Sequence, residues 1–214
     1  MIIAIANVKG GCGKTTIATN FAIARALAGR DTLLVDADDQ GSAADFTALR
    51  TEQLGKAGYT VMRLRGREVR TEVEKLIGKF EDIVVDVGGR DNEGLRAALT
   101  VADAVLIPLT PSSFDVWALD RMVGLVREAK GVNPKLRAVA ALNAADAQGH
   151  DNDEALSVLR DTEGVEALTS MLIRRKAYRN AAAQGRGVTD MNPKDPKAVE
   201  EMQTLVRAIF PTAE

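Results

Sequence analysis

The sequence is poor in the residues that form disulfide frameworks and metal clusters. Among its 214 residues it holds one cysteine, Cys12, and one histidine, His150. A single cysteine excludes an intramolecular disulfide framework. Together with one histidine, it also excludes zinc sites built from Cys and His and a cluster held by several cysteines of one chain.

Charge of one sign is not in excess, and long apolar runs are missing. The chain has 28 Lys and Arg against 30 Asp and Glu, a formal net charge of −2, so the whole chain lacks a basic nucleic-acid signature. No apolar run approaches the about 18 residues that indicate a membrane span. Residues 1–7 have no basic region before their apolar positions and do not resemble a secretory signal. We therefore expect a cytoplasmic protein with no membrane partner.

What is present is the composition of an ordinary globular protein, with 46% hydrophobic and 27% charged residues. At about 150 residues per domain, the length favours a single domain over residues 1–214.

Short β-branched runs alternate along the chain with longer segments of helical period. This alternation predicts an α/β fold, a mainly parallel twisted sheet flanked by helices on both faces. The run Ile83-Val84-Val85 is apolar at successive positions, as expected for a strand covered on both faces. The expected strands are residues 2–6, 32–35, 59–64, 83–87, 104–109, 136–142 and 168–173.

Three amphipathic helices are expected from their apolar stripes, and residues 143–153 are expected to form a polar surface loop. The stripes are Ile17, Phe21, Ala24 and Ala28, then Val116, Leu119, Val123 and Val126, then Val199, Met202, Val206 and Ile209.

Residues 7–16, between the first expected strand and helix, read Asn-Val-Lys-Gly-Gly-Cys-Gly-Lys-Thr-Thr, and we call them the phosphate loop. Glycines let backbone N–H groups converge on phosphate oxygens, Lys14 can reach the β and γ phosphates, and Thr15 can offer its hydroxyl to Mg²⁺. The usual G-x-x-x-x-G-K-[ST] pattern fails at its first glycine, which is Val8, and the rival dinucleotide-binding turn needs a G-x-G-x-x-G that the loop lacks. The predicted nucleotide-binding residues are Gly10, Gly11, Cys12, Gly13, Lys14, Thr15 and Thr16.

The run KGGCGKTT resembles the deviant Walker A motif of the ParA/MinD superfamily, P-loop ATPases that dimerise face to face around two ATP molecules. The resemblance implies that Lys14 holds the β and γ phosphates in its own subunit and that Lys9 reaches the partner's nucleotide. A lysine that neutralises phosphate charge only in the dimer couples hydrolysis to assembly. Cys12 occupies a variable position, and we interpret it as a small loop residue and not a nucleophile.

Carboxylates follow the phosphate loop in the order that this family requires. Asp36 and Asp38, two positions apart at the end of a strand, face the same side and resemble the switch I pattern D-x-D-x-Q-G. The resemblance implies that Asp38 positions the attacking water and that Asp36 lies on the magnesium side, with a helix cap as the alternative for either residue alone. Asp86, at the end of a Walker B-like strand, is expected to bind Mg²⁺, so the metal set is Thr15, Asp36 and Asp86.

The sequence indicates the residues that bind the nucleotide base less directly than those that bind phosphate. Asn143 and Asp146 have the spacing of the guanine-reading N-K-x-D motif, without its lysine. In the ParA family an Asn that ends this strand contacts adenine, so the resemblance implies Asn143 as an adenine contact and Pro193 as a second wall of the base pocket. The expected cofactors are ATP and Mg²⁺, and Asp146 is expected to be a loop or capping residue.

Missing features separate the sister families. Nitrogenase iron protein and the cluster-carrier ATPases need bridging cysteines, and arsenite pumps need a duplicated domain. Bacterial tyrosine kinases need a tyrosine cluster, and MinD needs an amphipathic membrane tail. The sequence then looks most like a short ParA-type partition ATPase without an N-terminal operator-binding domain.

In ParA relatives, basic residues after the seventh strand bind nonspecific double-stranded DNA when the ATP dimer forms. This chain concentrates positive charge at that place, around an expected helix, and the match by position is best for Arg175 and Arg179. A solvated helix face is the alternative for such a run. The candidate DNA-binding residues are Arg174, Arg175, Lys176, Arg179 and Arg186.

The resemblance thus implies a weak intrinsic ATPase that is a homodimer when ATP-bound, associates with the nucleoid, and is stimulated by an activating adaptor protein of ParB type. Its cargo would be a plasmid, a chromosome origin, a chemoreceptor cluster or a carboxysome. Two other interpretations stay open. One is a metabolic P-loop ligase of the dethiobiotin synthetase kind, and the other is an ATP-switched scaffold without DNA binding.

Overall fold

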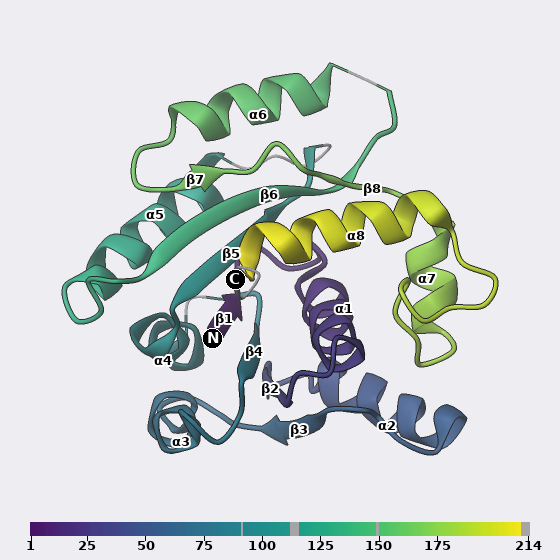
Figure 1. The fold of residues 1–214 in the computed structure, drawn as a ribbon. Coiled ribbons are helices and arrows are strands. Elements are labelled where there is room, and N and C mark those ends of the chain that lie inside the picture. The colour runs from purple at the N-terminus through teal and green to yellow at the C-terminus, as the bar shows by residue number, and fades with distance from the viewer. Residues whose placement is uncertain (91, 112–115, 149, 211–214) are drawn as a thin grey trace.

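The computed structural model describes residues 1–90, 92–111, 116–148 and 150–210 (Figure 1). The strands are β1 (Ile2–Ile5), β2 (Thr32–Ala37), β3 (Thr60–Arg63), β4 (Asp82–Val87), β5 (Ala104–Leu109), β6 (Arg137–Ala145), β7 (Glu166–Ala167) and β8 (Leu172–Ile173). The helices are α1 (Lys14–Leu27), α2 (Ser42–Leu54), α3 (Glu68–Leu76), α4 (Glu93–Val101), α5 (Val116–Lys130), α6 (Asp151–Asp161), α7 (Lys176–Ala182) and α8 (Pro196–Ile209).

The strands form a parallel sheet in the order β3-β2-β4-β1-β5-β6-β7, with β8 also pairing with β6. The first strand lies in the middle, between β4 and β5. The chain therefore builds one half of the sheet with β2 to β4 and the other half from β5 onward. Open parallel sheets bind ligands outside the carboxyl ends of their strands, at the point where the order reverses.

Helices cover both faces of the sheet, as the uninterrupted apolar strands predicted. Side chains alternate along β1, so Ala4 packs in one core cluster while Ile3 and Ile5 pack in the other. The Ala4 cluster includes buried residues of α3, α4, α5 and α6, and the Ile3 cluster includes residues of α1, α2, α7 and α8. Figure 1 shows the same division, with α1 and α8 together on one side of the sheet. The predicted fold class is confirmed.

Some local expectations were wrong. Residues 143–153 are not one loop, because β6 continues to Ala145 and α6 begins at Asp151. Instead of one strand at residues 168–173 there are two short strands, β7 just before this segment and β8 at its last two residues. In the expected apolar stripes, Ala28 lies beyond the end of α1 and is exposed, and Val116 is also exposed. Helices α3, α4 and α6 were not predicted.

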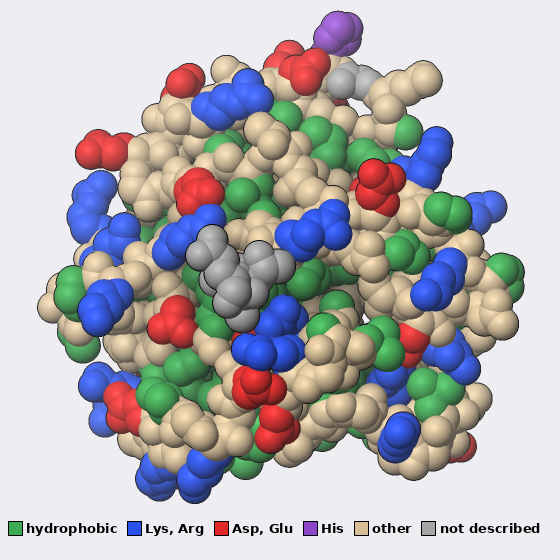
Figure 2. Space-filling view, in the orientation of Figure 1, with side chains coloured by type: hydrophobic (Ala, Val, Ile, Leu, Met, Phe, Trp, Pro, Cys, Tyr) green, Lys and Arg blue, Asp and Glu red, His purple; other side chains and the backbone are tan. Residues whose placement is uncertain are grey.

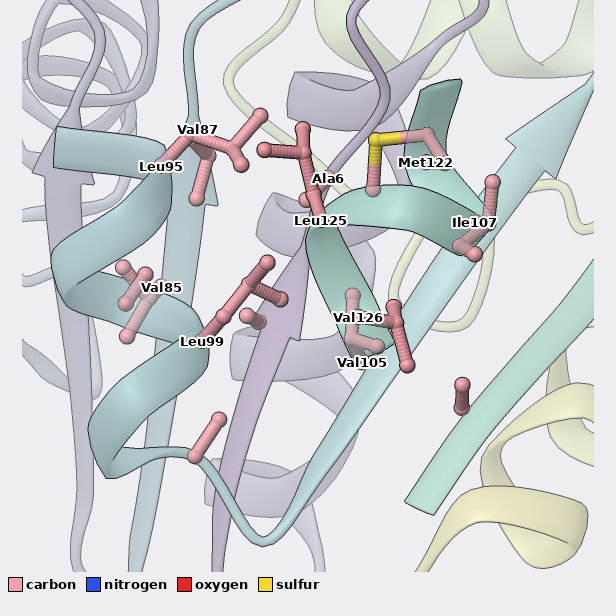
Figure 3. Packing of buried hydrophobic residues seen from close by; sticks show 14 of the residues in the cluster. Ala6, Val85, Val87, Leu95, Leu99, Val105, Ile107, Met122, Leu125 and Val126 are labelled. Atoms are coloured by element: carbon pink, nitrogen blue, oxygen red, sulfur yellow. The ribbon is translucent and has the colours of Figure 1, made fainter. Parts of the chain in front are cut away.

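Helix α4 is held to the sheet by apolar packing (Figure 3). Leu95 and Leu99 of α4 lie against Val85 and Val87 of β4, and α5 packs beside them in the same cluster. Leu99 is only 1% exposed, so its side chain is fully transferred from water into this contact.

A buried arginine ties α2 to the chain that follows α7. Arg50 donates from Nε to the Ala57 carbonyl at 2.7 Å and from Nη1 to the Gly185 carbonyl at 2.9 Å. Its Nη1 also lies 2.7 Å from Oδ2 of Asp190. Because the guanidinium is buried, these acceptors replace the water that it loses.

We expect Leu99→Ala to lower the free energy of unfolding by about 2–5 kcal/mol, because it removes buried methyl groups and leaves a cavity beneath α4. Leu27→Ala, at a leucine that is 59% exposed, is the matched control and should change stability by less than about 0.5 kcal/mol. Urea denaturation of both variants measures the difference. Equal losses would contradict the packing described for α4.

Candidate functional site

The phosphate loop leads from β1 into α1, as expected. Gly11 and Gly13 have φ of 75° and 85°, a backbone conformation that residues with a Cβ rarely adopt. Asn7 anchors the start of the loop, because its Nδ2 donates to the Pro108 carbonyl at 2.9 Å and its Oδ1 accepts from the backbone N–H of Lys9 at 2.9 Å. The loop then ends at the first turn of α1, where free backbone N–H groups favour anions.

Asn143, the predicted adenine contact, lies at the end of β6 and touches the phosphate loop. Its Nδ2 donates to the Cys12 carbonyl at 2.8 Å. A Cβ on Gly13 would lie 2.1 Å from that same nitrogen, so a side chain at position 13 would displace the Asn143 amide in addition to the strain that its φ imposes. Asn143 therefore holds the loop in place, and its contact with adenine stays a prediction.

A cleft of about 540 Å³ opens at the carboxyl ends of the central strands. It brings together the phosphate loop, the switch I aspartates and the two glycines that follow β4. Its lining residues are Gly10, Gly11, Gly13, Lys14, Thr15, Thr16, Asp38, Asp39, Gln40, Gly88, Gly89, Arg90 and Asn92.

Lys14 is buried at the floor of this cleft. Its Nζ donates to the Lys9 carbonyl at 3.0 Å. Gly89 passes close above it, since a Cβ on Gly89 would lie 3.3 Å from that Nζ and 2.9 Å from the Cα of Gly10. The segment after β4 thus sits directly on the phosphate loop and forms one side of the cleft.

Asp86 lies at the end of β4 and is fully buried. The Thr15 hydroxyl donates to its Oδ2 at 2.7 Å, whereas its buried Oδ1 has no hydrogen-bond partner in the described structure. Burial raises the pKa of Asp86 to about 7; the Thr15 hydrogen bond and Lys14 oppose this rise, and the charges of Asp36 and Asp38 add to it. A carboxylate that is costly to ionise alone is suited to a cation.

Thr15 and Asp86 fit a magnesium site. The described residues contain no group of three or more His, Cys, Asp and Glu side chains arranged to hold a metal. Mg²⁺ keeps much of its water shell and is held by one or two protein oxygens together with phosphate oxygens, so a sparse site of this kind suits it. There the ion would neutralise phosphate charge during hydrolysis.

Asp36 and Asp38 take different positions. Asp36 pairs in register with Asp86 on the neighbouring strand, and burial raises its pKa. Its carboxylate accepts from the backbone N–H of Asp38 at 3.1 Å and of Ala44 at 2.8 Å, so it holds the turn that leads into α2. Asp38 lines the cleft, and a Cβ on Gly88 would lie 3.2 Å from its Oδ1. This placement suits the predicted role of Asp38 toward water, and both roles stay predictions.

Lys9 and Pro193 lie outside this cleft. Lys9 lines a separate hollow of about 460 Å³ with Val8, Trp117, Ala118 and Arg121, which we call the Lys9 hollow. Pro193 lines another pocket, of about 630 Å³, beside α7. Cys12 is buried within the loop and its burial raises the pKa of its thiol, which agrees with a small loop residue and not a nucleophile.

The structure divides the five candidate DNA-binding residues. Lys176 and Arg179, on α7, are exposed and form no ion pair among the described residues. Arg174 is exposed and lies 3.8 Å from Asp146. Arg175, one of the two best matches by position, donates from Nε to Glu201 of α8 at 3.0 Å, and Arg186 donates to the Asp190 carbonyl at 2.9 Å. Figure 2 shows Lys and Arg side chains on the side of the molecule where α7 lies and also on the opposite side of the same view.

Sequence reasoning missed three residues. Arg90 and Asn92 line the cleft, and Asn92 also caps α4 by accepting from the Leu95 N–H at 2.9 Å. An Asn directly before Glu93 was an available cap signal. Trp117, the one tryptophan of the chain, lines the Lys9 hollow.

The phosphate loop leads into the first helix beside an open cleft, and a buried strand-end carboxylate accepts a hydrogen bond from Thr15 of that loop. These features define the class of P-loop nucleotide-binding proteins. The family model for the CobQ/CobB/MinD/ParA nucleotide binding domain (CbiA) matches residues 3–188. The chain belongs to this family. As a member of the ParA/MinD group within it, the protein is an ATPase, with ATP and Mg²⁺ as cofactors.

Two curated relatives are similar to this chain over most of its length, and a solved structure shows the same fold. The chain is 29% identical over 211 residues to the maintenance of carboxysome distribution protein A of Halothiobacillus neapolitanus, covering 98% of this chain and 96% of that protein. It is 31% identical over 203 residues to the protein of the same name from Gloeobacter kilaueensis, covering 93% and 88%. The solved structure of apo McdA from Cyanothece superposes with a TM-score of 0.82 at 16% identity, covering 98% of this chain and 99% of that chain.

We expect Asp86→Asn to abolish Mg²⁺-dependent ATP hydrolysis and yet to raise the free energy of unfolding of the nucleotide-free protein at pH 8 by about 1–3 kcal/mol. The pKa of Asp86 rises from 3.8 to about 7 on folding. Folding therefore favours the protonated form, and the wild-type protein loses stability as the pH rises from about 4 to about 7. The gain of the Asn variant over the wild type should grow across this window.

Asp82→Asn is the matched control, because Asp82 is a buried aspartate at the opposite end of β4 that accepts from Arg25 Nε at 2.7 Å. It should lower stability where Asp86→Asn raises it, since it breaks a buried ion pair. Denaturation curves from pH 4 to 8 and a phosphate-release assay measure both effects. A stability loss for Asp86→Asn at pH 8 would show that its buried charge is not a cost.

Proposed function

We propose that the protein is a single-domain, ParA-type positioning ATPase, cytoplasmic and associated with the nucleoid, whose ATP-bound dimer binds nonspecific DNA. The observation that supports an ATP-bound dimer is the position of Lys9. It belongs to the phosphate loop and yet lines a hollow beside the nucleotide cleft and not the cleft itself. A lysine in that position is suited to the phosphates of a second molecule, as the resemblance implied.

The charges of α7 and the start of α8 support the DNA part of the proposal. Lys176 and Arg179 are exposed, and Lys194 and Lys197 are exposed close by in the chain, with Lys176 and Lys194 lining one pocket. Four such cations can contact phosphates without reading bases. Arg175 is neutralised by Glu201 and makes a weaker candidate than its position in the motif suggested.

The names of the two relatives favour the carboxysome among the possible cargoes. In this proposal an adaptor protein, of ParB type in its role, stimulates hydrolysis and release from DNA, so that the cargo follows a gradient of the DNA-bound ATPase. The described residues include no helix with the length and apolar character to cross a bilayer.

Nonspecific double-stranded DNA should retain the protein with ATP and Mg²⁺, and not with ADP or without nucleotide. Lys176→Ala and Arg179→Ala should each weaken retention and reduce the slope of log affinity against log salt by about 2, because each substitution removes one phosphate contact per subunit of the dimer. Retention titrations at several stated salt concentrations measure this.

Arg127→Ala is the control for DNA retention, since Arg127 is an exposed arginine on α5, across the sheet from α7. It should leave retention unchanged. Arg175→Ala should act mainly through its ion pair with Glu201, so its salt slope should stay near that of the wild type. Absence of retention in every nucleotide state, with ATP turnover intact, would reject DNA binding and favour the ATP-switched scaffold.

Lys9→Ala should abolish ATP-dependent dimerisation and leave binding of ATP to the monomer within about threefold of the wild type, because Lys9 lies outside the cleft. Light scattering measures the dimer, and equilibrium binding of a fluorescent ATP analogue measures the affinity. Lys14→Ala, which removes a lysine inside the cleft, should instead abolish nucleotide binding. A Lys9→Ala protein that dimerises normally with ATP would remove the main support for the proposal.

A further inference from the structure

An exposed tryptophan stands at the beginning of α5. Trp117 is the one tryptophan of the chain, and it is 87% exposed. Its neighbour Val116 is 44% exposed. Tryptophan contributes more apolar surface than any other side chain and is usually largely buried, and it is enriched where proteins meet other proteins. An indole that packs so little on its own chain calls for a partner surface.

The position of Trp117 points to one partner. It lines the Lys9 hollow with Val8, Lys9, Ala118 and Arg121. Val8 and Lys9 lead directly into Gly10 and Gly11, which line the nucleotide cleft. The hollow and the cleft therefore share the phosphate loop as a common wall, and any molecule that covers Lys9 also approaches the indole.

We propose that Trp117 is a contact of the ATP-dependent dimer, packing against a second copy of this chain when both subunits hold ATP. This inference rests on the proposed function and deepens it by naming a surface residue of the dimer. In a two-fold dimer the same patch is used on both subunits, so each dimer buries two copies of Trp117. The indole adds apolar area to a face that otherwise consists largely of glycines and charged groups.

The place of the indole links this contact to nucleotide. The hollow adjoins the cleft through the phosphate loop, and Lys9 belongs to that loop. In the proposed dimer, the Lys9 of each subunit faces the ATP phosphates of the other. Bound ATP therefore brings the two Lys9 hollows together, and the apolar contact of Trp117 can form.

The test uses the fluorescence of Trp117. Because the chain has one tryptophan, its indole emission comes from this residue alone. The Asp38→Ala protein, designed to hold ATP without hydrolysis, is titrated with ATP and Mg²⁺ or with ADP and Mg²⁺, and light scattering follows its mass. We expect ATP alone to shift the emission to shorter wavelength and to reduce quenching by neutral acrylamide severalfold, over the same protein concentrations at which the dimer forms.

Substitutions separate affinity from chemistry. In the Asp38→Ala background, Trp117→Ala should raise the dimer dissociation constant at least about tenfold, and Trp117→Phe should raise it less, because part of the aromatic contact remains. Val132→Ala, at a valine that is 61% exposed beyond the other end of α5, should leave the constant unchanged. With Asp38 restored, ATP turnover by Trp117→Ala should recover at high protein concentration, since the residue acts through assembly.

The outcomes are distinct. A dimer that forms with ATP while Trp117 stays fully accessible to acrylamide overturns this inference and leaves the proposed function standing. An emission shift that is independent of protein concentration also overturns it, because the change then occurs within one subunit. No dimer with ATP at any concentration means that the proposed function fails, and this inference fails with it.

Discussion

The nucleotide site depends on a carboxylate that the fold buries at the carboxyl end of β4. Asp86 lies in register with Asp36 of the neighbouring strand β2 and receives one hydrogen bond from Thr15, while its other oxygen has no hydrogen-bond partner among the described residues. Ionising a group in such surroundings is costly, and the raised pKa expresses that cost. The phosphate loop beside it supplies positive charge and donors, through the Lys14 ammonium and the backbone N–H groups at the N-terminus of α1. The site therefore favours the binding of a cation and an anion together, as in a magnesium ion with a nucleotide phosphate.

Much of this site was predictable because each of its segments lies at the end of a strand that the sequence reveals. The phosphate loop, the Asp36-Asp38 pair and Asp86 each follow directly from a recognisable apolar strand. In a parallel sheet the carboxyl ends of the strands lie at one edge, so recognising the strands was enough to bring these segments together. The same apolar runs predicted the covered sheet.

Other features depended on contacts between distant parts of the sequence. The ion pair that neutralises Arg175 joins it to Glu201, 26 residues away on another helix, and charge counting within residues 174–186 could not reveal it. Helix α3 was missed because only Val69 and Val73 are buried along it, too few to form a clear apolar stripe. Trp117 could not be singled out from the pattern of its own helix, because the residues that it lies beside, Val8 and Lys9, belong to the distant phosphate loop.

Arg50 gives helix α2 a second anchor. Helix α2 is bonded at its start to Asp36, through the Ala44 N–H, and further along to Gly185 and Asp190 through the Arg50 guanidinium. Breaking the Arg50 contacts would strand a charge away from water, which is costly. Helix α2 is therefore tethered both to the strand-end aspartates of the nucleotide cleft and to the chain that follows the basic helix α7, so the two regions share one anchored helix.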